Sequence, residues 1–575
     1  MSASSKSSSK WASGPAIVLY LAAAKLLLHL LTAGRYGIFR DELYYLACAE
    51  HLDWGYVDQP PAIALIAKFA RHVFGSSLLG LRLLPAIAGA ALVWLAGNLT
   101  REMGGQRFAQ ALAALATLAA AIFLLFHHWL TMNAFEPLIW IGAAWCVVRA
   151  INPGPPAGQP GWGGNTGRAN YWLWFGVIIG VGLETKYSVI FFAFGIVVGL
   201  ILTPERRFLK SKWIWLGALA ALVIFLPNLL WLVKHDFPFL ELMRNIRESG
   251  RDVTHGPLGF IAEQALIMNP MLFPLWVGGL VWLFFGTEGR RYRIFGWAYV
   301  MMLVTFIVLK GKNYYLAPVY PILFAAGAIA FERLTVRTAR GSDRGSQEQA
   351  AGAGGRSLRT QKQPSAAAAR SPSELVHLPS APASCSWALW LRYLYVALII
   401  VGGASLAPLT LPILSPETYI RYQAALGFEP PKAENQNTGP LPQHFADEFG
   451  WEEMTRAVAE VYNSLSPEER AQTAIFANSY GQAGAIDFFG AKFGLPKAIS
   501  NHQNYWYWGP RNYTGAIVIV LGSDGDGDRE HFKTVHSVGR TYHPYSRRDE
   551  HFEIFLCRGL NQDLRTLWPT IKKWD

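Results

Sequence analysis

Apolar residues fill most of this chain in stretches of about twenty, and short polar connections separate these stretches. As an α-helix, a stretch of this length crosses the roughly 30 Å hydrocarbon core of a bilayer. The pattern predicts a polytopic α-helical membrane protein with about eleven transmembrane helices. The expected spans are residues 14–33, 78–98, 108–126, 131–150, 171–184, 187–203, 213–233, 270–286, 293–310, 314–332 and 388–410. The first stretch is long and lacks a small-residue cleavage site, so we expect it to remain as a span.

Basic residues in the short connections indicate which end of each span faces the cytoplasm. They fall on alternate connections, and short loops rich in Arg and Lys stay on the cytoplasmic side. The cytoplasmic set comprises Arg101 and Arg107, Arg149 and Arg168, the segment 206–212 and the segment 290–293. With the N-terminus inside and about eleven spans, the remaining connections and the C-terminal region are expected on the extracytoplasmic face of the cell inner (plasma) membrane.

The composition changes twice after the tenth expected span. Residues 1–333 form the expected transmembrane core, and residues 334–385 contain too few large apolar residues to order themselves, which predicts a disordered cytoplasmic linker. Residues 386–410 hold the last transmembrane helix. Residues 411–575 read as a small soluble α/β domain, expected outside. Its pattern predicts a helix at 451–465 and strands at 473–477, 516–521 and 552–556.

Overall composition supports this class and excludes others. The chain is 52% hydrophobic and 16% charged, far more apolar than a soluble domain needs. Its net charge of +12 comes from the cytoplasmic loops and the basic segment near 333–370, so it does not indicate nucleic-acid binding. The four cysteines have no pairable spacing, which supports neither a disulfide framework nor a zinc site.

Ionisable residues gather on the connections expected outside. Asp41 and Glu42 begin a short helix directly after the first span, where free backbone amides favour ionised carboxylates. An isolated pair of this kind is most often a helix cap. The other outer connections add Asp58, His127, His128, Glu136, Lys186, Lys310 and Lys312. Charges near the hydrocarbon boundary are costly, and a set that converges from separate loops is more often a functional site than an accident.

These groups suit a ligand that combines an anionic group with an apolar tail, such as a polyprenyl phosphate. Lysines bind phosphate oxygens, and a carboxylate can remove a proton from a hydroxyl that attacks the sugar's anomeric carbon. Two alternatives remain open. The lysines could instead extend to lipid headgroups. The chain could also be a transporter or flippase of lipid-linked sugars, although it shows no internal repeat of the kind that transporters carry.

Six short motifs resemble those of the bacterial protein-mannosyltransferase-like glycosyltransferases, a GT-C family that includes the aminoarabinose transferases acting on lipid A. The motifs are Arg40-Asp41-Glu42-Leu43-Tyr44-Tyr45, Asp58-Gln59-Pro60-Pro61, the segment 81–89, Met132-Asn133-Ala134-Phe135-Glu136-Pro137, Thr185-Lys186-Tyr187 and the segment 310–318. The resemblance covers roughly residues 15–335. It implies an inverting glycosyltransferase that moves a sugar from a polyprenyl-phosphate donor to a hydroxyl acceptor on protein, lipid A or a cell-envelope glycan, on the extracytoplasmic face.

The resemblance also implies roles for single residues. Asp41 would be the catalytic carboxylate, with Glu42 as its supporting neighbour. Donor-phosphate binding falls to Lys186, Lys310, Lys312, Tyr315 and Arg82, and the substrate pocket to Tyr44, Tyr45, Asp58, Gln59, Glu136 and His235. Some relatives carry Lys where this chain has Gln59, which brings no charge, so the clamp on phosphate would rely more on the lysines.

Two further features have open interpretations. His235 lies at the outer end of an expected span, where it could assist a metal ion or the donor, or simply end the helix. The aromatic run 504–508 could stack on a sugar ring or pack in a core. No metal-binding motif is evident, and a divalent cation remains possible.

Overall fold

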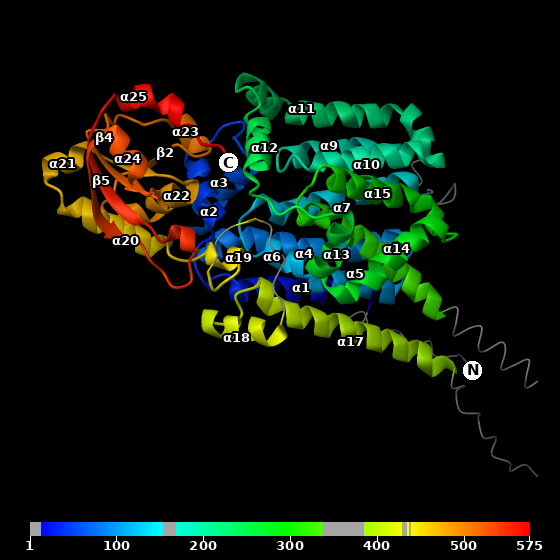
Figure 1. Cartoon of the computed structure of the whole chain (residues 1–575). Helices are drawn as coiled ribbons and strands as arrows, with labels where there is room; N and C mark the ends of the chain where they lie inside the picture. Colours follow the sequence, from blue (N-terminus) through cyan, green and yellow to red (C-terminus); the bar gives the residue numbers. More distant parts are fainter. Residues whose placement is uncertain (1–12, 153–167, 337–383, 428–433, 436–438) are drawn as a thin grey trace, which may run out of the picture.

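The computed structural model describes residues 13–152, 168–336, 384–427, 434–435 and 439–575. A helical bundle occupies one end of the molecule and a small sheet domain the other (Figure 1). The bundle helices are α1 (Gly14–Thr32), α4 (Leu78–Glu102), α5 (Arg107–Ala119), α6 (Ala121–Phe126), α7 (Met132–Ile151), α9 (Tyr171–Leu183), α10 (Val189–Ile201), α11 (Lys212–Lys234), α13 (Pro257–Met268), α14 (Phe273–Phe285), α15 (Arg293–Val308), the helical segment Asn313–Val336, and α17 (Ser384–Thr410). Three shorter helices lie where the bundle meets the sheet domain: α2 (Arg40–Glu50), α3 (Ala62–Phe74) and α12 (Pro238–Ser249).

Each expected span contains helix, which confirms the multi-pass helical class, but the count of eleven stays a prediction. By length and composition, seven helices of the described residues can cross a membrane, or up to nine if each of two bent pairs is one span. The expected span 108–126 is divided into α5 and α6 by Ala120, whose backbone is extended. Helix α9 has only 13 residues, about 20 Å of helix, in keeping with the short pair expected between 171 and 203.

The sheet domain confirms the predicted small α/β region. Its strands are β1 (Thr473–Ala477), β2 (Ile499–Ser500), β3 (Ile517–Leu521), β4 (Phe532–Arg540) and β5 (Glu553–Leu560), in the order β2-β1-β3-β5-β4. β1 runs parallel to β2 and β3, whereas β5 runs antiparallel to β3 and β4. Its helices are α18 (Pro416–Leu426), α19 (Gln443–Ala446), α20 (Trp451–Ser464), α21 (Pro467–Gln472), α22 (Tyr480–Phe489), α23 (Asn504–Trp508), α24 (Asp526–His531) and α25 (Leu564–Leu567).

Alternation along the central strand β3 gives the sheet two buried faces. Ile519 and Leu521 pack with α20 and α22, and Val518 and Val520 pack toward Trp568. This is the period-2 pattern of a strand covered on both sides.

One apolar core of the sheet domain extends into α2 and the adjacent end of the bundle. The cluster that includes Ile519 also includes Leu43 and Leu46 of α2. Helix α22 lies along α2, and Gly484 permits the close approach because an added Cβ would lie 3.0 Å from the backbone carbon of Leu43. The first turn of α2 is therefore fixed between the bundle and the C-terminal region.

The expected linker at 334–385 is shorter at both ends than the sequence predicts. A helix continues through Val336, and α17 begins at Ser384. Residues 337–383, which carry most of that prediction, lie outside the described residues.

Candidate active site

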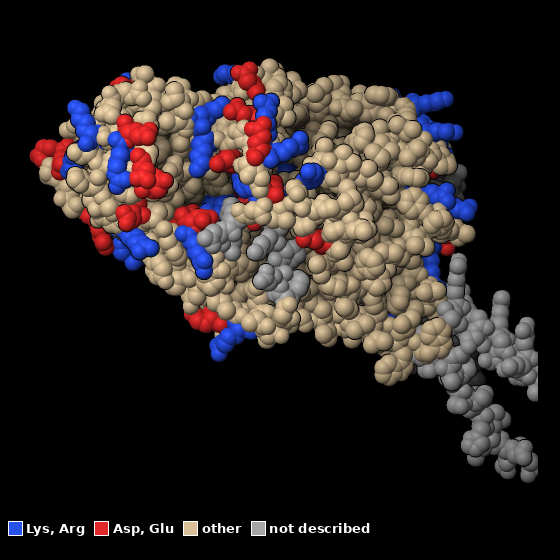
Figure 2. All heavy atoms as spheres, viewed as in Figure 1, with Lys and Arg blue, Asp and Glu red and all other residues tan. Residues whose placement is uncertain are grey.

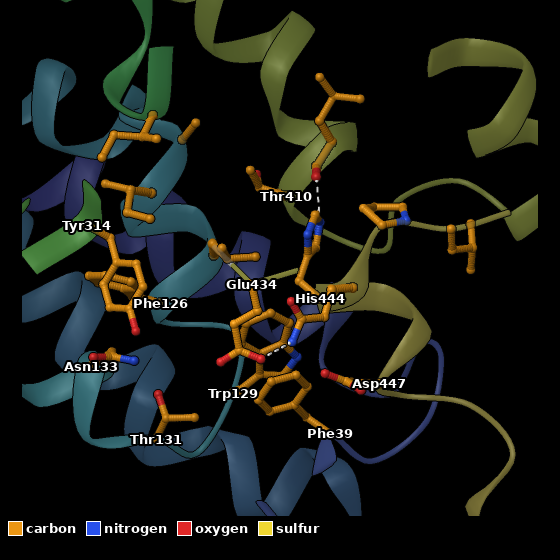
Figure 3. A pocket seen from close by; sticks show the side chains of 18 of the residues that line it. Phe39, Phe126, Trp129, Thr131, Asn133, Tyr314, Thr410, Glu434, His444 and Asp447 are labelled. Carbon is orange, nitrogen blue, oxygen red and sulfur yellow. Dashed lines mark hydrogen bonds between the residues drawn. The ribbon is translucent and has the colours of Figure 1, made fainter. Parts of the chain in front are cut away.

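A cavity of about 360 Å³ opens between the bundle and the C-terminal region. Its apolar wall comes from α6, α13 and α17, through Ile122, Leu125, Phe126, Leu266, Ile267, Leu406 and Leu409. Its other end is polar and holds Arg40, Asp41, Lys312, Glu434 and Asp447. Figure 3 shows part of this arrangement, with Phe126 and Tyr314 on one side and Glu434, His444 and Asp447 on the other. We call it the amphipathic cavity.

Asp41 lies at the polar end, in the first turn of α2. Its side chain is 29% exposed, and Oδ1 accepts a hydrogen bond of 2.8 Å from the hydroxyl of Tyr480 on α22. Arg40 Nε lies 3.5 Å from the same oxygen, and its guanidinium lies over the Tyr480 ring at 5.3 Å. The second oxygen, Oδ2, has no hydrogen-bond partner among the described residues. This carboxylate is held from one side and open on the other, which suits a group that accepts a proton from a bound hydroxyl.

Lys312 brings a positive charge to the same end. Its Nζ lies 2.9 Å from Glu434 Oε1 and 3.2 Å from Asp252 Oδ1, and its side chain is 11% exposed. Burial would raise the pKa of Glu434, but Lys312, Arg40 and Arg251 hold it well below its ordinary value. Cations and carboxylates therefore alternate here, and an incoming phosphate could replace Glu434 as the partner of Lys312.

Lys310 differs from its expected position. It is exposed, has a left-handed backbone with φ of 53°, and does not line the amphipathic cavity. The turn between α15 and the next helix directs Lys312 to the cavity and leaves Lys310 outside, so the structure does not support Lys310 as a phosphate ligand.

Lys186 lies one side chain away from the cavity. Its Nζ is 2.8 Å from Glu136 Oε2 and 2.7 Å from Asn133 Oδ1. It also lies over the rings of Tyr315 and Tyr314, at 5.0 and 5.5 Å. Asn133 and Tyr314 line the cavity, so Lys186 can affect it through them. Glu136 is paired with Lys186 and does not itself line the cavity.

Glu42 and Arg82 form a buried pair beneath Asp41 and do not line the cavity. Arg82 donates to both oxygens of Glu42, at 3.1 and 2.8 Å, and also to the backbone oxygens of Ala33 and Gly37. Glu42 further accepts the backbone N–H groups of Phe39 and Leu130. These contacts use the polar atoms of both groups and fix the start of α2, and phosphate binding by Arg82 stays a prediction.

A third member of this network comes from the C-terminal region. Glu448 Oε2 lies 3.3 Å from Arg82 Nη2, and its Oε1 accepts the indole N–H of Trp129 at 3.2 Å. Burial raises the pKa of Glu448 to about 8, although Arg82 favours its charged form. Burial likewise opposes the charge of Glu42, but Arg82 and the hydrogen bonds lower its pKa. The two carboxyl groups therefore differ, with Glu42 charged and Glu448 protonated at neutral pH.

The remaining expected pocket residues lie at the junction with the sheet domain and do not line the amphipathic cavity. The Tyr44 hydroxyl donates a hydrogen bond of 3.0 Å to Asp58 Oδ1 and lies 3.4 Å from Asn504 Oδ1. The neighbouring Tyr45 is also buried. Burial raises the pKa of Asp58 to about 7, although the hydrogen bond from Tyr44 acts to lower this pKa.

Gln59 and His235 lie away from the cavity as well. Gln59 is fully buried, with its amide nitrogen 3.7 Å from Cys48 Sγ, and it does not line the cavity. His235 stacks on Trp231 at 4.1 Å and packs edge-on against Tyr507 of α23. The loops that carry these residues fold back under the C-terminal region instead of facing the cavity.

The cavity also contains residues that the sequence reasoning missed: Arg40, Trp129, Glu434, His444 and Asp447, with Tyr480 behind Asp41. Arg40 stood beside Asp41 in the quoted motif and could have been included. The residues from the C-terminal region carried no motif. In the described residues no three His, Cys, Asp or Glu side chains converge to hold a metal ion, and a divalent cation stays a prediction.

Comparison with known proteins identifies the fold. Residues 58–231 match the family described as dolichyl-phosphate-mannose-protein mannosyltransferase. The lipid A galacturonosyltransferase RgtD of Rhizobium johnstonii is 28% identical over 284 residues, which are 48% of this chain and 56% of that protein. The chain thus spans little more than half the length of this curated relative.

Solved structures match over nearly the whole chain. ArnT from Cupriavidus metallidurans bound to undecaprenyl phosphate superposes with a TM-score of 0.55 and 14% identity, covering 94% of this chain and 97% of that one. The oligosaccharyltransferase of Archaeoglobus fulgidus gives 0.51 and 13% identity, covering 85% of this chain and 64% of that one. The chain is therefore a multi-pass membrane protein with the fold of the GT-C glycosyltransferases, and its residues 58–231 are similar to the dolichyl-phosphate-mannose-protein mannosyltransferase family.

Proposed function

We propose that the protein is an inverting glycosyltransferase that moves a sugar from a polyprenyl-phosphate donor to a hydroxyl acceptor. The observation that carries the proposal is the amphipathic cavity, in which an apolar wall leads to Asp41, Arg40 and Lys312. A polyprenyl chain lies against the wall, and the phosphate reaches the cations. The ArnT structure with undecaprenyl phosphate and the lipid A transferase RgtD support this ligand class over a transporter.

In the proposed reaction Asp41 acts as the general base. The acceptor hydroxyl attacks the anomeric carbon as its proton passes to the open oxygen Oδ2, and the bond from that carbon to the phosphate oxygen breaks on the opposite face. The leaving phosphate keeps the electron pair, and Arg40 and Lys312 stabilise its charge. Lys186 acts through Asn133 and the Tyr314 ring. The acceptor is a hydroxyl of protein, lipid A or a cell-envelope glycan.

We also propose that the cavity and the C-terminal region are extracytoplasmic, in the inner membrane. Figure 2 shows Lys and Arg side chains gathered at the end of the bundle farthest from the sheet domain, with few charges on the bundle surface between. That end carries the basic connections 206–212 and 290–293, which the positive-inside rule assigns to the cytoplasm. Within this arrangement residues 1–333 are the transmembrane core, and residues 411–575 complete the site instead of forming an independent unit.

The test combines a cellular and a purified assay. Glycolipid and glycoprotein profiles of a deletion strain, compared with its parent, identify the missing sugar. Transfer by the purified protein is then measured for Asp41→Asn, which keeps the shape but removes the basic oxygen and should lower kcat by about 10² or more. Glu50→Gln, an exposed carboxylate at the far end of α2 paired with Arg71, is the matched control and should transfer normally.

Donor binding is measured in the same preparation with a short-chain polyprenyl phosphate. Lys312→Met should weaken it by about 1.5 to 3 kcal/mol, the scale of a hydrogen bond between charged groups. Lys310→Met, two residues away and outside the cavity, should leave it unchanged. Normal turnover by Asp41→Asn, or equal donor affinity in both lysine variants, contradicts the proposed site.

A further inference from the structure

A second cavity, of about 720 Å³, lies at the opposite end of the bundle, between α1, α5, the segment Asn313–Val336 and α17. Three arginines line it: Arg107, Arg333 and Arg392. Its apolar lining includes Ile17, Phe108 and Val336. We call it the arginine cavity. The 19 residues of α1 separate its level from that of Asp41 by roughly 28 Å, so it is not part of the donor site.

The acidic residues in this cavity already have partners. Glu332 accepts the backbone N–H groups of Gln106 at 2.8 Å and Ala109 at 3.0 Å, and so caps the first turn of α5. Glu288 is paired with Arg333. Neither carboxylate forms an ion pair with Arg107 or Arg392 among the described residues.

Arg392 and Arg107 therefore keep positive charge facing the cavity. Arg392 donates to Thr335 Oγ1 at 2.8 Å and to the backbone oxygen of Glu332 at 3.1 Å, and it lies 4.5 Å from the Phe108 ring. These contacts orient the guanidinium without supplying a counter-charge. Arg107 is exposed and has no hydrogen bond or ion pair with any described residue. Two arginines without acidic partners, one of them held in place, are a ready site for an anion.

Aromatic side chains indicate the depth of this cavity in the bilayer. Trp390 and Tyr393, beside Arg392 on α17, are 72% and 70% exposed, and Trp215 at the same end is 67% exposed. Exposed Trp and Tyr of membrane proteins gather at the level of the lipid headgroups. The arginine cavity thus opens at headgroup depth, with apolar lining next to it for the upper part of an acyl chain.

We propose that the arginine cavity binds an anionic phospholipid, with Arg107 and Arg392 on the phosphodiester of its headgroup. Basic pockets between transmembrane helices on the cytoplasmic side bind such headgroups. The lipid would join α5 to α17, a helix with only 17% of its apolar window buried within the protein. This proposal does not depend on the proposed transfer reaction.

The experiment uses the purified full chain in an uncharged detergent. Thermal unfolding and native mass spectrometry are followed while phosphatidylglycerol, phosphatidylcholine of the same acyl chains, or inorganic phosphate is added. Phosphatidylglycerol should raise Tm and remain bound, and the other two should not. Arg107→Gln should weaken the apparent affinity roughly tenfold, the effect of losing one charged hydrogen bond.

Arg101→Gln is the control, because Arg101 is exposed at the same end but does not line the cavity. It should keep the affinity of the unchanged protein. Arg392→Gln should weaken binding further, and Arg107→Gln decides the question if the Arg392 variant does not fold. Equal effects of the two lipids, equal losses at Arg101 and Arg107, or an equal response to inorganic phosphate would each overturn the proposal.

Discussion

At the residue scale, the contact between Asp41 and Tyr480 gives the C-terminal region a direct part in the proposed chemistry. Tyr480→Phe keeps the ring under Arg40 but removes the 2.8 Å hydrogen bond. We expect kcat to fall roughly tenfold, less than for Asp41→Asn, with donor affinity kept.

Steady-state kinetics and donor binding check this prediction. Tyr542→Phe, an exposed tyrosine of the same region, is the control and should behave as the unchanged protein. A Tyr480→Phe protein with the kcat of the unchanged protein, or with weakened donor affinity instead of a lower kcat, would remove Tyr480 from this positioning role.

Glu448 predicts a pH dependence of stability. Its pKa is about 8 in the folded protein and 4.5 ordinarily, so between these values the unfolded chain has released a proton that the folded protein keeps. The free energy of unfolding should therefore fall as pH rises through this window, by at most about 1.4 kcal/mol per pH unit. The stabilisation is complete below the lower value and lost above the upper one.

Glu448→Gln mimics the protonated carboxyl and should flatten the fall of Tm between about pH 5 and pH 8. Thermal unfolding in detergent, repeated across this pH range, measures the change of Tm with pH. Glu453→Gln, an exposed residue on α20, should keep the original slope. If Tm falls with pH equally steeply in the unchanged protein and in Glu448→Gln, the raised pKa of Glu448 is contradicted.

Sequence reasoning placed Asp41 at the start of α2 because the free backbone amides of a helix N-terminus favour acidic residues. It could not separate Lys310 from Lys312, since that depends on the left-handed backbone at Lys310, a residue type that rarely adopts it. It also could not find Glu434, Asp447 or Tyr480, because contacts across some 400 residues of chain leave no local pattern.

At the scale of elements, the packing of α22 on α2 sets the position of the first turn. Gly484→Val puts side-chain atoms against the backbone of Leu43 and should cost about 1 to 3 kcal/mol of stability, the usual effect of overpacking. Transfer activity should fall with it, because Asp41 moves relative to Tyr480. Tm and kcat are the measurements.

Gly527→Val in α24 is the matched change, because an added Cβ there has open space. It should leave activity unchanged. Full activity and unchanged Tm in Gly484→Val would mean that the two helices do not need this close contact.

Periodicity and composition predicted most elements well, and the strands at 473–477 and 516–521 and the helix at 451–465 are confirmed within a residue. The break between α5 and α6 was not predicted. Ala120 interrupts that helix without a Pro or Gly, and an extended alanine in an apolar run has no sequence signal. The short helix after the break carries Ile122, Leu125 and Phe126, which line the cavity.

At the scale of the whole molecule, the orientation in the membrane is testable with reporter fusions. Alkaline phosphatase fused after residue 430 should be active, and the same enzyme inserted within 337–383 should be inactive, because the basic connections hold that end in the cytoplasm. A fusion in the short connection 206–212 is the internal control and should match the inactive one. Activity of the 337–383 fusion would reverse the proposed orientation.

The sequence indicated two bodies, a membrane core and a soluble domain, because composition changes sharply after α17. The structure joins them through the apolar cluster that connects the sheet domain to α2 and through the buried polar network of Glu42, Arg82 and Glu448. Composition reports what solvent a segment faces, and it does not report what the segment packs against. That is why the boundary was visible from the sequence and the shared site was not.

The separation of Asp41 and Tyr480 along the chain has a consequence for biosynthesis. The ribosome adds 439 residues between them, which takes roughly 20 to 90 seconds at bacterial rates. Throughout that time the first helices are already in the membrane, with the base present but its partner not yet made. A product that ends before the last quarter of the chain therefore lacks Glu434, Asp447 and Tyr480 and holds only part of the proposed site.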